Sequence, residues 1–372
     1  MRATENMTQA AQDRKWMRRA IALAHLSEGY TRPNPPVGAV VVRGGRKLGE
    51  GRHQCAGCAH AEVEALNACR EPVKGATLYV TLEPCCTHGR TPPCTERILR
   101  DGIARVVVGC RDENGCHCGR GLELLSKRGV DVVYGVCEAE AKELVVPFFK
   151  HVNTGMPFVT LKLAMTMDGH IADRKASSKW ITGEAARDEV QRMRRRADAV
   201  MVGAGTVLAD NPSLLCRKGG GGKLMRVIVD SRGLTPSAAR VVTDEAASRT
   251  VMATVRGLEA KRASAWSAQG AQVWAFAPDR QAHVPLKRLL KRLGGVGCLH
   301  VLCEGGGRLA GALHDAGLVD EYCFFYAPAV LGDSRGVYAV EGNGSLLSRM
   351  ARMRCVETKR LGDDLMVRVR KA

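Results

Sequence analysis

The chain alternates strand-like apolar runs with helix-like amphipathic segments, and it does so in two series. In the first series the expected strands and helices are, in order, Val37–Arg43, His60–Cys69, Thr77–Leu82, Thr95–Arg100, Arg105–Cys110, Leu122–Lys127 and Val130–Tyr134. This alternation is typical of an α/β sheet that is covered by helices. The pair Gly44-Gly45 follows the first strand, where a tight turn would reverse the chain into a second strand.

A connector near residue 155 separates the two series. A helix is expected over Glu138–Lys150, and Asn153–Pro157 then has turn character. Because 372 residues are about twice a typical domain, we divide the chain into residues 8–152 and residues 153–372. The expected elements of the second series are a strand over Phe158–Met165, a helix over Glu184–Arg196 capped by Thr182, strands over Ala199–Gly203, Arg226–Asp230 and His300–Cys303, and a helix over Leu309–Asp315.

The cysteines and the charge narrow the class of protein. Ten of the fifteen cysteines come before residue 150, which indicates a metal site in the first half more than a disulfide scaffold. Met1–Lys15 is polar, and no run of about 18 apolar residues occurs, so we expect a cytoplasmic protein. The net charge of +18 favours anionic partners, which include phosphorylated metabolites, nucleic acid and membrane surfaces.

Three dispersed residues have the donor atoms of a catalytic zinc site. His60-Ala61-Glu62 begins an expected helix, Pro84-Cys85 ends a strand, and Cys94 follows. One imidazole and two thiolates would leave a fourth zinc position for water, while Glu62 stays available to move protons. That combination suits the hydrolytic deamination of an aromatic ring. The motif His-x-Glu is weak evidence by itself, since a histidine at a helix start beside a glutamate more often belongs to a capped turn at the surface.

Two segments around these residues resemble the deaminase half of the bifunctional riboflavin-biosynthesis deaminase-reductase family. They are Pro33–Gly38 and Thr81–Cys94, the second of which shares the family's long spacing between the two cysteines. The resemblance implies a cytidine-deaminase-like α/β/α domain. It implies one Zn²⁺ on His60, Cys85 and Cys94, a proton carrier in Glu62, and a pyrimidine pocket lined by Asn34 and His53. The family commonly has a histidine two residues after the first zinc cysteine. Here Thr87 stands at that position and His88 follows it, so neither residue is assigned to the substrate pocket.

Two other clusters of cysteines leave open whether the chain binds a second metal ion. Cys55-x-x-Cys58 and Cys116-His117-Cys118 both have metal-like spacing. A reduced cytoplasmic thiol, however, more often behaves as a small hydrophobic side chain. Cys86, next to Cys85, is interpreted as a bystander.

The second half is similar to the family's reductase domain, which has a dihydrofolate-reductase-like α/β fold. The similarity lies in Phe158–Gly169, Ser178–Gly183, Gly205–Pro212 and Cys303–Gly307. It implies NADPH contacts at Ala164, Trp180, Thr206, Asp210, Ser231, Gly306, Gly307, Arg308, Leu309, Ala310, Gly311 and Ala312. It implies substrate contacts at Lys162, Ser178, Arg194, Leu214, Arg217 and Glu304.

The resemblance implies two consecutive reactions. The first deaminates 2,5-diamino-6-ribosylamino-4(3H)-pyrimidinone 5′-phosphate, and the second reduces the ribosyl group with NADPH to give 5-amino-6-ribitylamino-uracil 5′-phosphate. Ser231-Arg232 at the end of a strand favours NADPH, whereas Asp230 would favour NADH. The expected partners are the phosphorylated pyrimidine and NADPH, without nucleic acid or membrane, and a homo-oligomer is left open.

Two rival interpretations remain open. A deaminase of free or nucleic-acid cytosine or adenine with an accessory domain is mildly favoured by the charge of +18. Only 4% of the residues are aromatic, which is sparse for base stacking, and the basic residues are dispersed over both halves. A noncatalytic zinc-binding module would leave Glu62 and the motifs of the second half unexplained.

Overall fold

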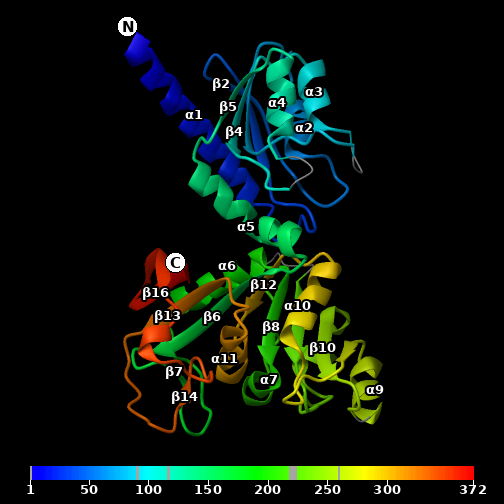
Figure 1. Ribbon diagram of the computed structural model, residues 1–372, viewed down its shortest axis with the longest axis vertical. Helices are drawn as coiled ribbons and strands as arrows, with labels where there is room; N and C mark the ends of the chain where they lie inside the picture. The colour runs from blue at the N-terminus through cyan, green and yellow to red at the C-terminus, as the bar shows by residue number, and fades with distance from the viewer. Residues whose placement is uncertain (1, 89–91, 115–117, 218–223, 259) are drawn as a thin grey trace. The chain divides into compact units, whose positions relative to one another are not determined.

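The structure is a computed structural model, and it describes residues 2–88, 92–114, 118–217, 224–258 and 260–372 (Figure 1). It divides into two compact units, Met1–Thr154 and Gly155–Ala372. None of the helices in these ranges is long and apolar enough to cross a membrane.

The first unit is built on a five-stranded sheet with the order β2-β1-β3-β4-β5. The strands are β1 (Gly38–Arg43), β2 (Arg46–Arg52), β3 (Thr77–Leu82), β4 (Arg105–Cys110) and β5 (Asp131–Tyr134). Strand β1 pairs antiparallel with β2 and with β3, and β3, β4 and β5 are parallel. Gly44 and Gly45 have φ values of +56° and +73° in the β1–β2 turn, which confirms the expected hairpin.

Helices cover both faces of this sheet. Helices α1 (Arg2–His25) and α5 (Glu138–Thr154) pack on one face, and α2 (Ala61–Asn67), α3 (Cys94–Arg100) and α4 (Arg120–Lys127) pack on the other. Alternate residues of β1 serve the two faces: Val40 and Val42 contact the first set, and Ala39 and Val41 the second. The expected α/β/α arrangement is therefore present.

Two helices of this unit differ from the sequence-based expectation. Helix α1 was not predicted, because its sequence is mostly polar and it buries only a narrow apolar stripe that includes Met17, Ala20 and Ala24. Helix α5 continues beyond the predicted end at Lys150, and the Thr154 hydroxyl donates to the Lys150 carbonyl at 2.6 Å. The helix gives way to Gly155, whose φ of +68° is a left-handed conformation.

The second unit contains a nine-stranded sheet with the order β11-β10-β9-β8-β12-β6-β13-β16-β15. Its strands are β6 (Phe158–Thr166), β8 (Ala199–Gly203), β9 (Met225–Val229), β10 (Thr250–Val255), β11 (Gln272–Phe276), β12 (His300–Cys303), β13 (Glu321–Ala327), β15 (Met353–Leu361) and β16 (Asp364–Lys371). The strands from β11 to β13 run parallel, as predicted, whereas β15 and β16 form an antiparallel hairpin that was not predicted. A separate two-stranded sheet joins β7 (His170–Ala172) to β14 (Val337–Tyr338).

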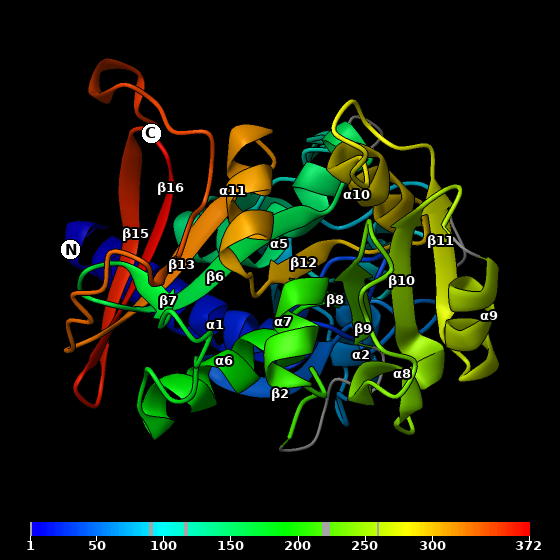
Figure 2. The same ribbon diagram turned by 90° about the horizontal axis from the view of Figure 1, so that it is seen from below.

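Helices again lie on both sides of the larger sheet (Figure 2). They are α6 (Glu184–Arg196), α7 (Ala204–Asp210), α8 (Arg240–Thr243), α9 (Ala260–Ala268), α10 (Leu286–Gly295) and α11 (Gly307–Asp315). Helices α10 and α11 share one core cluster with the sheet, and α8 shares another with Trp266 of α9. The layered packing leaves the loops after the parallel strands to form the site described below.

Thr182 does not cap helix α6, so that prediction was wrong. The N-cap residue is Gly183, whose backbone N–H donates to the Asp364 carboxylate of β16 at 2.7 Å. Thr182 instead accepts a hydrogen bond at its carbonyl from Arg187 at 2.7 Å. No side chain caps the first turn of the helix, and a carboxylate from a distant strand binds the N-cap residue's own N–H instead.

A buried ionic network fixes α1 to the first sheet. Asp13 of α1 is 5% exposed and accepts two hydrogen bonds from Arg105 of β4, both at 2.9 Å, and one from the Tyr79 hydroxyl at 2.8 Å. Burial raises the pKa of the Asp13 carboxyl, but the hydrogen bonds from Arg105, Tyr79 and Gln9 outweigh it and lower the pKa below its usual value.

We expect Asp13→Ala to lower the free energy of unfolding of this unit by about 2–3 kcal/mol, because it removes the main partner of the partly buried Arg105 and the acceptor of the Tyr79 hydroxyl. Asp131→Ala is the matched control: Asp131 binds the same guanidinium at 2.9 Å but is 64% exposed, so we expect about 1 kcal/mol or less. Urea unfolding curves of the three proteins test this. Equal losses in both variants would contradict it.

The same network predicts a pH dependence. Because the folded-state pKa of Asp13 is lowered, its contribution is present above the unfolded-state pKa of about 4 and is lost as the pH falls through the folded-state value. The difference in stability between the wild type and Asp13→Ala should therefore shrink below about pH 4. A difference that stays constant down to acid unfolding would contradict this assignment.

Candidate active sites

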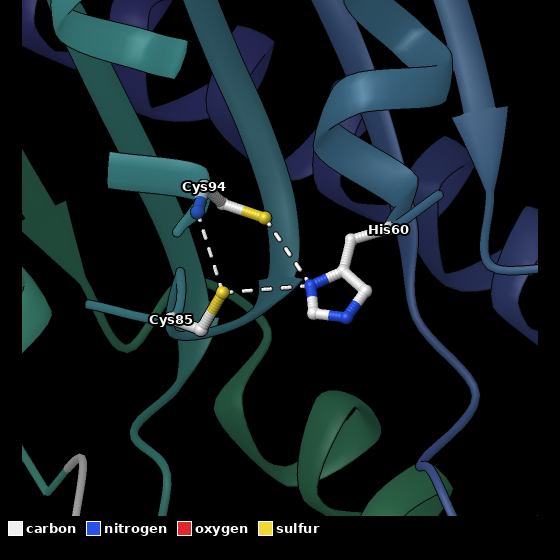
Figure 3. A group of neighbouring side chains, drawn as sticks. All are labelled: His60, Cys85 and Cys94. Carbon is white, nitrogen blue, oxygen red and sulfur yellow. Dashed lines mark hydrogen bonds between the residues drawn. The ribbon is translucent and has the colours of Figure 1, made fainter. Parts of the chain in front are cut away.

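Three side chains from three different elements converge in the first unit (Figure 3). His60 is the N-cap residue of α2, Cys85 follows β3, and Cys94 begins α3. The Nδ1 atom of His60 lies 3.5 Å from the Cys85 sulfur and 3.3 Å from the Cys94 sulfur. The three donor atoms lie within 4.8 Å of one another, and in the described part of the chain no other group of three His, Cys, Asp or Glu residues does so.

The electrostatics of these groups suit a bound cation and a proton carrier. A hydrogen bond from Cys94 lowers the pKa of Cys85 to about 4; burial opposes this shift and His60 adds to it. Burial raises the pKa of Glu62 to about 7, and the nearby Cys85 charge adds to that effect. A carboxyl group with a pKa near neutrality exchanges protons readily at physiological pH.

One nitrogen and two sulfur donors fit Zn²⁺, which prefers these atoms in four-coordinate sites. Because this chain supplies three donors, a fourth position would stay open to water, as in catalytic zinc sites. The alternative of a second metal at Cys55 and Cys58 is not favoured, because the structure joins these two residues in a disulfide. Cys116 and His117 lie outside the described residues, and Cys118 is exposed.

His53 lies beside His60 of this donor group, and Asn34 contacts His53. The rings of His53 and His60 are in edge contact with centroids 5.4 Å apart. Nδ1 of His53 lies 3.0 Å from the Ala59 carbonyl, which can only accept, so Nδ1 carries the proton. Burial lowers the pKa of His53, so the ring is neutral and its Nε2 accepts from the Asn34 amide at 3.0 Å. This arrangement leaves the Asn34 carbonyl oxygen to receive a proton donor.

Glu83 is a supporting residue that the sequence did not reveal. Its carboxylate accepts backbone hydrogen bonds from Asp112 at 3.2 Å and from Gly119 and Gly121 at 2.9 Å. It is 4% exposed and lies two residues before Cys85. Thr87 and His88 are exposed, and His88 Nε2 lies 4.0 Å from the Glu96 carboxylate.

The second unit has a cavity of about 1610 Å³. Residues that directly follow β8, β9 and β12 line it, because the carboxyl ends of parallel strands meet at one edge of the sheet. Strand β12 lies between β6 and β8, so the chain order changes direction there, which is where open α/β sheets bind ligands. The cavity exceeds the usual size for one drug-sized ligand and has room for two.

The cavity brings together most residues that the resemblance implied for the reductase. Its lining includes Lys162, Ala164, Ser178, Trp180, Arg194, Thr206, Asp210, Leu214, Arg217, Ser231, Glu304, Gly306, Gly307, Arg308, Leu309 and Ala312. Ala310 and Gly311 do not line it. Ala310 is fully buried in the core, and a side chain at Gly311 would collide with the backbone of Glu341.

Charged groups inside the cavity are already partly paired. Arg194 donates two hydrogen bonds to Glu304, at 2.6 and 2.9 Å, and these side chains are only 12% and 10% exposed. Burial lowers the pKa of Lys162, and the negative charge of Glu304 opposes that shift. Arg217 is exposed at the cavity wall. Since Arg194 is held by Glu304, Arg217 is the better placed arginine for an anionic ligand.

The Asp230 carboxylate is occupied by hydrogen bonds within its own turn, although the residue lines the cavity. It is 1% exposed, and its two carboxylate oxygens accept from the backbone of Leu234 at 2.9 Å and of Thr235 at 2.7 Å. The Ser231 hydroxyl accepts from Val284 N–H at 2.9 Å, so its own proton can be donated to a ligand. Asp230, the acidic residue that favoured NADH in the sequence, therefore stabilises its own turn.

Two other cavity residues were missed by the sequence analysis. Gln191 accepts the backbone N–H of Arg217 at 2.9 Å, and Arg187 lies over the ring of Trp180 at 4.7 Å from its centroid. Both are in α6, where one polar side chain among many gives no signal by its type or its spacing. Only the pairing with distant loops distinguishes them.

Comparisons with known proteins agree with this geometry. Residues 157–367 match the RibD C-terminal domain, and residues 10–110 match the cytidine and deoxycytidylate deaminase zinc-binding region. The riboflavin biosynthesis protein RibD of Bacillus amyloliquefaciens is 40% identical over 352 residues, which cover 94% of each chain. The chain belongs to the RibD family.

Solved structures of related proteins match nearly the whole chain. A protein of Thermotoga maritima, described as a diaminohydroxyphosphoribosylaminopyrimidine deaminase/5-amino-6-(5-phosphoribosylamino)uracil reductase, is 37% identical with a TM-score of 0.86 and covers 98% of this chain and 100% of its own. RibD of Acinetobacter baumannii in its form 1 is 34% identical with a TM-score of 0.85, over 98% of this chain and 99% of its own.

Membership in the RibD family confirms several sequence-based expectations. These are the α/β fold class with a deaminase-like and a reductase domain, the bifunctional enzyme class of riboflavin biosynthesis, and the zinc and NADPH cofactors. The matched deaminase region contains His60, Cys85 and Cys94. The roles of individual residues stay predictions.

We expect Cys94→Ser to lose its stoichiometric zinc, because it removes one of the three converging donors. Cys86→Ser is the matched control: it changes the neighbouring cysteine, which is not in the cluster, and should keep one zinc per chain. Metal analysis of the purified proteins decides. A Cys94→Ser protein that retains full zinc would show that another residue is the ligand.

Proposed function

We propose that the first unit deaminates 2,5-diamino-6-ribosylamino-4(3H)-pyrimidinone 5′-phosphate and that the second reduces the resulting aminouracil to its ribitylamino form. The observation that carries this proposal is the convergence of His60, Cys85 and Cys94 beside the buried Glu62. The large cavity of the second unit supports the second reaction. The Thermotoga maritima relative carries both activities in its description.

In the deaminase reaction, the chain's residues handle protons and orientation. Zinc held by His60, Cys85 and Cys94 would supply a Lewis acid that makes water nucleophilic near neutral pH. Glu62 takes a proton from the water that adds to the ring carbon and delivers it to the departing amino group, so ammonia leaves and a carbonyl forms. The Asn34 carbonyl oxygen accepts from the pyrimidine, since the Asn34 amide nitrogen is held by His53.

In the reductase reaction, the chain's residues align donor and acceptor. NADPH would supply the hydride that adds to C1′ of the ribosylamine; the bond from C1′ to the ring oxygen breaks, and that oxygen takes a proton from solvent to become a hydroxyl. Arg217 binds the 5′-phosphate by charge-assisted hydrogen bonds, and Arg194 holds Glu304 in the cavity wall. Ser178, a proposed substrate contact, donates to Asp210, a proposed cofactor contact, at 2.7 Å, which couples the two subsites.

The two activities belong to successive parts of the chain in this proposal. We assign deamination to residues 8–152 and reduction to residues 153–372, close to the division between the two units at Thr154 and Gly155. A cytoplasmic location and assembly into a homo-oligomer stay predictions, which cell fractionation and sedimentation of the purified protein would test.

We expect Glu62→Gln to slow deamination about a thousandfold, because it removes the proton carrier while keeping the shape of the side chain. Zinc content and NADPH oxidation with the aminouracil substrate should stay unchanged, since Glu62 is not a ligand and belongs to the other unit. Ammonia release measures the first activity. Glu64→Gln, on the same helix, is the control that should remain active.

Near wild-type deamination by Glu62→Gln would contradict the proton-carrier role. A parallel loss of reduction would instead contradict the assignment of the two activities to separate units.

We expect the reductase to prefer NADPH, with Ser231 and Arg232 contacting the 2′-phosphate. Arg232→Ala should lower the ratio of kcat/KM for NADPH to that for NADH about tenfold, because it removes a charge-assisted hydrogen bond. Arg288→Ala is the control: it removes an exposed arginine that does not line the cavity and should leave the ratio unchanged. An unchanged ratio in Arg232→Ala would refute this contact.

A further inference from the structure

Arg226 in β9 is an arginine that is completely buried in the second unit. Its side chain is 0% exposed, and a buried guanidinium is costly unless its N–H groups find partners. Two of its nitrogens donate to the two carboxylate oxygens of Asp244, at 2.6 and 2.8 Å. The same nitrogens also donate to the carbonyls of Ser213 at 2.9 Å and Val241 at 3.0 Å. One side chain thus joins β9, the end of α8 and the loop 211–217.

The loop 211–217 carries two of the proposed substrate contacts, Leu214 and Arg217. Leu214 is 2% exposed and has a φ of +58°, a left-handed conformation that a leucine adopts only when its surroundings impose it. On the side of α6, Arg194 donates to the Leu215 carbonyl at 3.1 Å and Gln191 accepts from the Arg217 backbone at 2.9 Å. On the side of β9, Arg226 holds the residue before Leu214.

The two sets of hydrogen bonds therefore clamp Leu214 from both directions. Without the Arg226 guanidinium, the Ser213 carbonyl and the Asp244 carboxylate both lose a partner. The strained conformation of Leu214 then loses one of its two anchors, and the loop can relax to a commoner backbone conformation. Such a change would move the Arg217 side chain along the cavity wall.

We propose that Arg226 is a positioning residue for the reductase substrate: through Ser213 it fixes loop 211–217 so that Arg217 meets the 5′-phosphate. Arg226 does not line the cavity, so it acts only through the loop. The inference rests on the proposed phosphate role of Arg217, and the experiment separates the two.

The measurement is the phosphate preference of the reductase. It is the ratio of kcat/KM for the phosphorylated aminouracil substrate to kcat/KM for the same compound without its 5′-phosphate. A variant that merely damages the fold lowers both values and keeps the ratio. Arg217→Ala sets the scale, and we expect it to lower the ratio about tenfold or more, as for the loss of a charge-assisted hydrogen bond.

Two variants of the buried pair are compared with a matched control. Arg226→Lys keeps the charge but lacks the fork that spans Asp244 and Ser213, and Arg226→Met with Asp244→Leu removes both charges so that neither stays buried alone. The control is Ile228→Val, which shortens a fully buried residue on the same strand, in the core cluster that also holds Leu214, but removes none of the hydrogen bonds that hold the loop. The deaminase activity of each chain gives an internal measure of enzyme concentration.

We expect both Arg226 variants to lower the phosphate preference toward the Arg217→Ala value, while Ile228→Val keeps the wild-type ratio. The KM for NADPH should stay unchanged in all of them. Because Arg226 acts through Arg217, adding Arg226→Lys to Arg217→Ala should lower the ratio no further.

If the Arg226 variants lose stability and both kcat/KM values fall together at a constant ratio, Arg226 is only structural and the inference is wrong. If Arg217→Ala itself keeps the wild-type ratio, the proposed phosphate role fails, and the inference falls with it. A ratio that falls further in the combined variant would show that Arg226 acts by another route.

Discussion

Parallel strand pairing is the constraint on which both sites depend. Because parallel strands end at the same edge of a sheet, residues far apart in the sequence meet where the strands stop. In the second unit, β12 pairs with β8 and with the middle of β6, and this register brings Glu304, at the end of β12, close to the end of β8 and to Lys162 of β6. In the first unit, Cys85 follows β3 and is supported by Glu83, which binds the loop after the parallel neighbour β4. The candidate functional residues lie mostly in loops, and the positions of the strand ends determine how far apart these loops are.

Buried ion pairs then hold those loops and helices in position. Asp13 with Arg105 and Arg194 with Glu304 join elements that are distant in sequence, and Arg226 with Asp244 joins β9 to the end of the next helix, α8. Such pairs add little net stability, because desolvation offsets most of the attraction, but losing one partner is costly. These pairs fix the positions of the elements that they join, because the planar, forked guanidinium can donate two hydrogen bonds to a carboxylate only in a narrow range of positions.

Much of the fold followed from local patterns. Strands Thr77–Leu82, Arg105–Cys110, Ala199–Gly203 and His300–Cys303 were predicted with the bounds that the structure has, because continuous apolar runs between turn residues leave few alternatives. Helix α1 was missed because its exposed face dominates its composition. The hairpin of β15 and β16 was missed because β15 is largely polar and exposed, and β16 mixes apolar with charged residues that are mostly half-buried, so neither strand gives a continuous apolar run.

The sequence by itself determined the chemistry, since the residue types at His60, Glu62, Cys85 and Cys94 decide which metal and which reaction are feasible. Only the tertiary structure decided which charges are available to ligands. Asp230 is occupied by its own turn, and Arg194 is occupied by Glu304, which lies 110 residues away in the chain. The role of Arg226 likewise arises only when Ser213 and Asp244 are brought to it. Side-chain identity is local, whereas hydrogen-bond partners and burial come from contacts between distant segments.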